Sequence, residues 1–170
     1  MRGITAAFVA LVASAAALPA AAQDVQPLGT FQDWEAYSYT EDSNQVCYMV
    51  SEPQKERGDY AKRGDTYVMI THRPAKNAEN VVSVIAGYSY KDGSEVAVDI
   101  GGHDYTLFTH EDSGWAADPQ TDKALVRAMR RGLKMVVKGR SARGTLTTDT
   151  YSLRGFTAAH RAINKACNVD

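Results

Sequence analysis

The chain has 170 residues, 44% of them hydrophobic, and a formal net charge of −1. This length fits one domain with a single core and leaves no room for two, and the apolar content excludes disorder of the body. The near balance of charge hides a division. Residues 23–121 carry 17 acidic and 7 basic side chains, whereas residues 122–170 carry 3 acidic and 11 basic ones. Such a division indicates either internal pairing or a surface for a partner.

The first 22 residues have the pattern of a secretory signal peptide. Arg2 supplies the positive start, Ile4 to Leu18 the apolar stretch, and Ala20 to Ala22 the small residues of a cleavage site. The apolar stretch is shorter than the roughly 20 residues that span a bilayer, and no later segment is long enough. We therefore expect mature protein to begin at Gln23, to be periplasmic or secreted, and not to span a membrane.

Two strands are predicted first, over residues 30–40 and 46–51. In the first, Trp34, Ala36 and Tyr39 are the candidates to face inward, and in the second Cys47 and Met49 share one side. The short polar segment between them predicts a hairpin.

Residues 53–66 are polar and rich in turn residues, and we predict a loop. The loop contains two Arg-Gly-Asp triplets, Arg57-Gly58-Asp59 and Arg63-Gly64-Asp65. Gly-Asp is common in turns, yet the same triplet serves in cell adhesion, so a host-surface adhesion loop is one hypothesis for this segment.

Four more strands are predicted over residues 67–72, 80–88, 95–100 and 104–109. In residues 95–100, apolar and polar side chains alternate, which is typical of a half-buried strand. Gly101-Gly102 favours a tight hairpin between the last two strands, because adjacent glycines tolerate positive φ.

A helix is predicted to follow Asp118-Pro119, a typical N-cap and first helical residue, and to end at Gly132. Strands are then expected over residues 133–138 and 146–153, around a loop at 139–144. A last helix over residues 156–167 buries Phe156, Ala159, Ile163 and Cys167 on one stripe. Short strands separated by turns, with two short helices, indicate a mainly β protein built as an antiparallel β-sandwich.

The only two cysteines, Cys47 and Cys167, are expected to form a disulfide because the protein is expected to be exported. The bond would staple the last helix onto an early strand. Chain-entropy reasoning gives it roughly 4 to 5 kcal/mol.

The basic side chains of the second part form a block without an acid from Lys123 to Arg143. It is a candidate face for an anionic lipid, polysaccharide or other anionic partner in the envelope or on a host surface. The alternative is a solvated face, partly neutralised by the acids just upstream and by helix-end electrostatics. Specific nucleic-acid binding is not expected, since no recognised module is present. The candidate residues are Arg127, Arg130, Arg131, Lys134, Lys138, Arg140 and Arg143.

No pattern for catalysis, for a metal or for a cofactor is found. The four histidines lie far apart without ligand spacing, and the chain lacks the short motifs of serine hydrolases and of phosphate-binding loops. We therefore expect a protein that is not an enzyme, has no cofactor and binds no metal. An envelope hydrolase with an unrecognised site is the alternative.

The mature chain as a whole resembles the invasion-associated locus B family. The motifs that carry the resemblance most specifically are Ser141-Ala142-Arg143-Gly144-Thr145, Thr148 to Leu153, and Gly155 to Ala159. The resemblance implies an exported protein of alphaproteobacterial type with an immunoglobulin-like β-sandwich, and a link to host-cell invasion in some members. It supplies no catalytic residues. Tyr37 and Tyr39 occupy the region where many members carry another cysteine.

Overall fold

The computed structural model describes residues 24–169. The expected signal peptide over residues 1–22 and the expected new start at Gln23 lie outside this range. Among the residues described, no helix has the length and apolar character needed to cross a bilayer.

Residues 24–169 form eleven strands, two α-helices and one short 3-10 helix. In order they are β1 (Gln26–Phe31), β2 (Trp34–Glu41), β3 (Asn44–Ser51), β4 (Lys55–Gly58), β5 (Tyr67–Arg73), η1 (Pro74–Lys76), β6 (Ala78–Ile85), β7 (Glu95–Ile100), β8 (His103–His110), β9 (Ser113–Trp115), α1 (Pro119–Arg131), β10 (Lys134–Arg140), β11 (Leu146–Ser152) and α2 (Phe156–Cys167).

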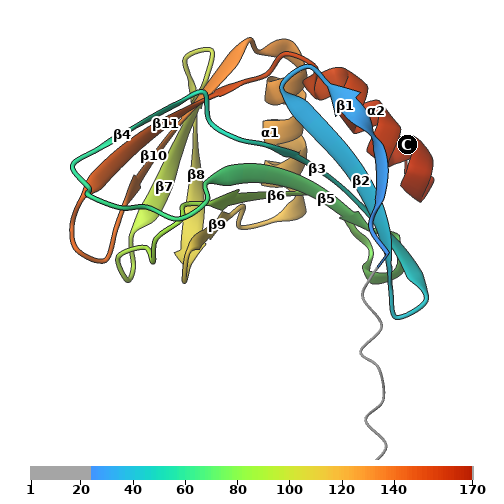
Figure 1. The fold of residues 1–170 in the computed structure, drawn as a ribbon, viewed down its shortest axis with the longest axis horizontal. Helices are drawn as coiled ribbons and strands as arrows, with labels where there is room; N and C mark the ends of the chain where they lie inside the picture. The colour runs from blue at the N-terminus through green and yellow to red at the C-terminus, as the bar shows by residue number, and fades with distance from the viewer. Residues whose placement is uncertain (1–23, 170) are drawn as a thin grey trace, which may run out of the picture.

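All strands belong to one hydrogen-bonded sheet, in the order β1-β2-β3-β5-β6-β9-β8-β7-β10-β11-β4, and every pairing is antiparallel. The short strand β9 joins two halves set at an angle to each other (Figure 1). We call β1-β2-β3-β5-β6 the first half and β8-β7-β10-β11-β4 the second half. Trp34 in the first half donates its indole N–H to the carbonyl of Ser152 in the second, at 3.0 Å. The mainly β, antiparallel architecture with two helices is confirmed, and an immunoglobulin-like sandwich is compatible with it.

One face of this sheet lines the core, and the opposite face lies outward. On the core-facing side, Trp34, Met49 and Ile70 of the first half are fully buried, as are Val96 and Met135 of the second half. Burial of these side chains is the main stabilising contribution, at about 25 cal/mol for each Å² of apolar surface removed from water.

The two helices pack against the core-facing side of the first half. Helix α2 lies across β1, β2 and β3 (Figure 1). The Phe156 ring of this helix meets Trp34 edge-on, with centroids 4.9 Å apart. Helix α1 lies beside β6, and Asp122 in its first turn accepts a hydrogen bond from the Val82 amide at 2.8 Å. Since β9 pairs only with Ser83 to Ile85, this carboxylate supplies an acceptor where β6 lacks a neighbouring strand.

The predicted disulfide is confirmed. Cys47 on β3 and Cys167 in the last turn of α2 are bonded, with Cα atoms 6.0 Å apart and 120 residues between them in sequence. The bond fixes the end of α2 to the middle of the first half.

Most predicted elements are confirmed. Asp118 caps α1 by accepting hydrogen bonds from the amides of Gln120 and Thr121, each at 2.8 Å, and Gly132 ends the helix. The hairpin around Gly101-Gly102 is present, and both glycines have positive φ. The buried stripe of α2 also contains the four residues predicted for it.

Three predictions in the first part of the chain are wrong. The expected strand over residues 30–40 is split, because Gln32 adopts a φ of 57° and turns the chain between β1 and β2. Tyr39 was expected to face inward, but its neighbour Ser38 does so. The expected loop over 53–66 contains β4, which pairs with β11 through backbone bonds that polar side chains do not prevent. Strand β9 was not predicted at all.

Candidate functional site

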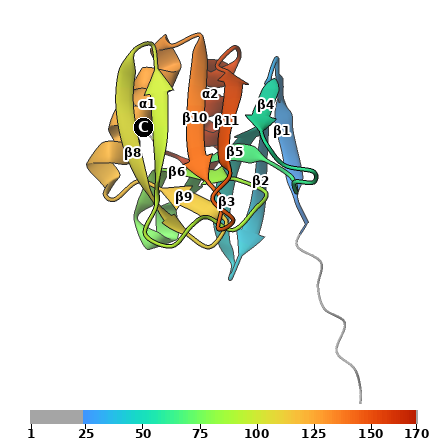
Figure 2. The ribbon, with the colours of Figure 1, turned by 90° about the vertical axis from the view of Figure 1, so that its left-hand side faces the viewer.

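The basic block between Lys123 and Arg143 is divided between two sides of the second half of the sheet. Arg127, Arg130 and Arg131 are exposed on α1, which lies behind the second half in Figure 2. Lys134 and Lys138 are exposed on β10, whose alternate residues Met135 and Val137 are buried in the core. The strand lysines therefore point outward, away from the helix. The structure does not bring the seven predicted residues into one face.

Strand β4 adds cations to the outward face of β10. The register aligns Arg57 with Thr148, and Thr148 with Lys138, so these three residues form a row across β4, β11 and β10. A second row runs from Lys55 through Thr150 to Val136. We call this outward surface of β4, β11 and β10 the cationic strand face. It consists of Lys55, Arg57, Lys134, Lys138 and Arg140, with threonines between them.

The same outward surface becomes acidic on β7 and β8. Asp99 on β7 is paired with Val136 of β10 and with Asp104 of β8. Glu95 lies on the same surface of β7 and extends the acidic area along the strand. Within residues 24–169, none of these acids and none of the β10 cations lies in an ion pair within 4.0 Å. The charge reversal along the sequence thus becomes a lateral division across the outward surface of the second half.

Arg140 and Arg143, the last two residues of the basic block, lie at the turn between β10 and β11. The guanidinium of Arg140 donates to the Gly144 carbonyl at 2.8 Å, across the turn between β10 and β11. Arg143 at this turn lines an open groove with the segment 59–64 and Tyr88. In this groove, Arg143 of the predicted cationic residues lies beside the predicted adhesion segment.

The two Arg-Gly-Asp triplets have different environments. In the first, Arg57 and Gly58 end β4 and Asp59 follows, all three exposed. In the second, Gly64 and Asp65 are exposed, but the side chain of Arg63 is only 4% exposed. The Gly64 amide donates to the Gly87 carbonyl at 2.9 Å. The two backbone segments are so close that a side chain at Gly87 would collide with the Gly64 carbonyl.

Arg63 forms a buried, two-pronged ion pair with Asp149 of β11. Both guanidinium N–O distances are 2.7 Å, and Nε donates to the Ala86 carbonyl at 2.6 Å. The guanidinium also lies over the Tyr88 ring, 5.0 Å from its centroid. Burial lowers the pKa of Arg63, but the hydrogen bonds and charge of Asp149 raise it by more, so the group stays charged. In this structure, Arg63 holds the fold together and is not free to contact a partner.

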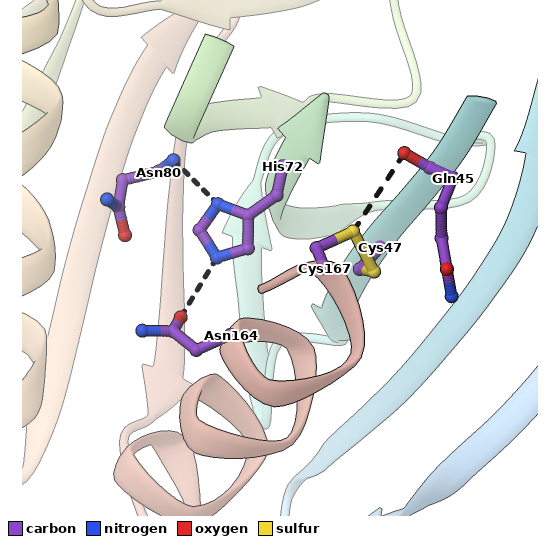
Figure 3. Close-up of a disulfide and its surroundings, with 6 residues drawn as sticks. All are labelled: Gln45, Cys47, His72, Asn80, Asn164 and Cys167. Carbon is purple, nitrogen blue, oxygen red and sulfur yellow. Dashed lines mark hydrogen bonds between the residues drawn. A yellow bond between two sulfur atoms is a disulfide. The ribbon is translucent and has the colours of Figure 1, made fainter. Parts of the chain in front are cut away.

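His72 is buried next to the disulfide, opposite Cys47 on the neighbouring strand (Figure 3). His160 is also buried, and its ring centroid lies 5.8 Å from that of His72. Nδ1 of His72 accepts from the Asn80 amide at 3.0 Å, so the proton is on Nε2, which donates to Asn164 on α2 at 3.0 Å. His160 donates to the side chain of Asn80 at 2.7 Å. Burial lowers the pKa of both, that of His160 to about 4, so both are neutral at physiological pH.

The partners of this buried cluster are not those of a Ser–His or Cys–His nucleophile pair. The hydrogen-bonding partners of the two imidazoles are asparagines and a backbone amide, with no serine, cysteine or carboxylate within hydrogen-bond distance in the described chain. Across residues 24–169, no group of three His, Cys, Asp or Glu side chains could hold a metal ion. The arrangement positions α2 on β5 and β6.

A surface that the sequence did not indicate lies on the outward face of the first half. It is a concave groove of about 740 Å³ over β2, β3 and β5, whose aromatic lining includes Tyr39, Tyr48 and Tyr67. We call it the tyrosine groove. The alternation of β3 places Val46, Tyr48 and Val50 opposite to Cys47 and Met49. Both sides of β3 are apolar, so hydrophobic pattern alone could not tell which side is covered.

The sequence model described as "Invasion associated locus B (IalB) protein" matches residues 34–164 of the chain. The crystal structure of invasion associated protein B from Bartonella henselae is similar, with a TM-score of 0.56 and 15% sequence identity. The similarity covers 82% of this chain and 97% of that one. None of the curated proteins matches the sequence.

Proposed function

Because the chain belongs to the invasion-associated locus B family, we propose that it is an exported, non-enzymatic protein of the cell envelope that binds an anionic partner. The contact surface in this proposal is the cationic strand face on β4, β11 and β10. The proposed partner belongs to the envelope or to a host surface. A role in host-cell invasion is included in the proposal only because the chain belongs to this family.

The observation that carries the proposal is the arrangement of cations on a solvent-facing sheet. Lys138 and Arg57 lie in one cross-strand row on either side of Thr148, and no carboxylate stands between them. Neighbouring cations repel each other, so an anion that contacts both relieves this repulsion. Threonine hydroxyls between the cations can donate to phosphate, sulfate or carboxylate oxygens.

Export is supported by the leader pattern of residues 1–22 and by the Cys47–Cys167 disulfide. Such bonds persist in oxidising compartments and are rare in the cytosol. Fractionation of cells that express the tagged full-length chain tests this part. We expect a periplasmic or secreted product whose N-terminus is Gln23, and a cytosolic product that retains Met1 would contradict it.

The binding test compares two charge reversals of equal size. One variant carries Lys134→Glu and Lys138→Glu on the strand face, and the other carries Arg127→Glu and Arg131→Glu on α1. Retention on phosphatidylglycerol vesicles and on anionic envelope extract is measured against sodium chloride concentration. We expect the strand variant to lose retention and its salt dependence to fall by about two counterions, while the helix variant stays close to the unmodified protein.

Both other outcomes count against the proposal. Equal losses in the two variants would mean that overall charge alone controls retention. Unchanged retention in the strand variant would remove the cationic strand face as the contact surface.

A further inference from the structure

The outward face of the first half is not covered by either helix. The residues that pack on α2 and α1 lie on the opposite side of β2, β3 and β5, where Trp34, Met49 and Ile70 are fully buried. The outward side forms the tyrosine groove of about 740 Å³. This volume is in the range of small-molecule sites, about 300 to 1,000 Å³.

Aromatic side chains from adjacent strands line this groove together. Tyr48 on β3 stacks on Tyr37 of β2, which supports it from outside the lining, with centroids 5.3 Å apart and planes inclined by 22°. Tyr39 meets the same Tyr48 ring edge-on, with centroids 6.0 Å apart. Packing between the rings holds them in place, which reduces the entropy lost when a ligand binds to them. Val50 and Met69 are paired across β3 and β5 and add an apolar part to the lining.

The charged groups of the groove favour a positive ligand. Asp33, Glu35 and Glu52 line it, and within residues 24–169 none of them is in an ion pair within 4.0 Å. Arg73 is the one cation in the lining. Its Nε lies 3.5 Å from a carboxylate oxygen of Glu41, outside the groove lining, and its guanidinium donates to the Tyr39 hydroxyl at 3.3 Å. The Tyr37 hydroxyl donates to Glu35, and the three carboxylates together give the lining an excess of negative charge, which attracts a cation and repels an anion.

We propose that the tyrosine groove binds a small organic cation, with a quaternary or primary ammonium group over the tyrosine rings and its carbon skeleton against Val50 and Met69. The faces of tyrosine rings are negative and attract ammonium groups, and recognition of quaternary ammonium by aromatic side chains is a well-established use of this attraction. The carboxylates add longer-range attraction for the cation. The ligand preference is therefore opposite in charge to that of the cationic strand face.

The test uses two probes of nearly equal shape that differ in charge. Choline carries a quaternary ammonium, and 3,3-dimethyl-1-butanol has a carbon atom in place of the nitrogen. Each is titrated into the disulfide-bonded mature protein at low salt, and amide chemical shifts are followed by NMR. We expect saturable shifts on β2, β3 and β5 with choline, and an affinity about tenfold lower for the neutral probe.

Variants separate the contributions of ring and charge. Tyr48→Leu removes the central ring and should abolish the saturable shifts, whereas Tyr48→Phe keeps the ring face and should retain most of the affinity. Glu52→Gln should weaken choline binding and leave the weaker binding of the neutral probe unchanged. Glu95→Gln, on β7 of the other half, is the matched control and should have no effect.

Three results would overturn the proposal. They are equal affinities for the two probes, shifts that map to the second half of the sheet, and no saturable shift with choline while the protein remains folded by its amide spectrum. A fourth result would also overturn it: shifts that depend on protein concentration without any probe would assign the groove to contacts between copies of the chain. Because the test does not involve the cationic strand face, its outcome is independent of the proposed function.

Discussion

Replacing Asp149 by alanine leaves the guanidinium of Arg63 buried without its main partner. The two side chains are 4% and 3% exposed and are joined by two bonds of 2.7 Å. Removing one member of a buried ion pair typically costs 3–5 kcal/mol, because the remaining charge stays out of water. We therefore expect Asp149→Ala to lower the free energy of unfolding by about 3–5 kcal/mol, or the melting temperature by roughly 10 °C or more.

The two Arg-Gly-Asp triplets provide a matched control for this prediction. Arg63→Ala should also be strongly destabilising, since it leaves the carboxylate of Asp149 unpaired. Arg57→Ala removes the same side chain from an exposed position on β4 and should change stability by no more than about 0.5 kcal/mol. Urea unfolding at pH 7 with the disulfide intact, followed by circular dichroism, measures all three variants.

A double variant tests whether the cost comes from the unpaired charge. In Arg63→Met/Asp149→Leu both charges are absent, and apolar side chains of similar size replace them. We expect this variant to be more stable than either single alanine variant, within about 2 kcal/mol of the unmodified protein. If the double variant loses as much as the two single changes combined, the two side chains act independently and the reasoning from charge burial is wrong.

Three further changes test buried polar groups. Burial raises the pKa of Asp122 to about 6, so its ionised form destabilises the fold above that pH. Asp122→Asn keeps an acceptor for the Val82 amide and should add about 2 to 3 kcal/mol at pH 7.5, a gain that disappears at pH 4 in urea titrations. His160 has the opposite effect on the pH dependence of stability. Burial lowers its pKa in the folded protein to about 4, so the unfolded chain takes up the proton first as the pH falls below 6.5 and the fold loses stability. In the Asp122→Asn background, His160 alone should lower stability by about 3 kcal/mol between pH 6.5 and 4, and His160→Gln should remove that part, leaving a slope of the same sign from His72, whose pKa burial also lowers. The hydroxyl of Tyr151 is fully buried and has no hydrogen-bond partner in the described chain, so Tyr151→Phe should raise the melting temperature and stabilise by about 1 kcal/mol; a loss of stability would show that the hydroxyl is satisfied.

The parts of the fold that the sequence predicted correctly have local signals. Asp118-Pro119 and Gly132 mark the ends of α1 because capping and backbone geometry act over a few residues. The alternation of Val96, Val98 and Ile100 identified the buried side of β7. The disulfide was predictable because only two cysteines were present.

The parts that the sequence did not predict depend on distant contacts. The turn at Gln32 has no glycine or proline to mark it, since a non-glycine residue adopts the left-handed conformation there. The sequence around Arg63 predicts a solvated loop residue. Its partner Asp149 is 86 residues away in sequence, and only the folded position of β11 places the two side chains together. The tyrosine groove was missed because β3 is apolar on both sides, and Tyr39 was assigned to the wrong one.

The Cys47–Cys167 bond closes residues 47–167 into a covalent ring, and β1 and β2 lie outside that ring. The ring restricts how far the enclosed strands can separate when the protein opens locally, but it places no such restriction on the β1–β2 hairpin at the edge of the sheet. Tyr37 and Tyr39 belong to this hairpin, whereas Tyr48 and Tyr67 belong to the ring. Local release of this edge hairpin would therefore take the tyrosine groove apart and would also remove Trp34 from the core, whereas the cationic strand face on β4, β11 and β10 lies within the ring.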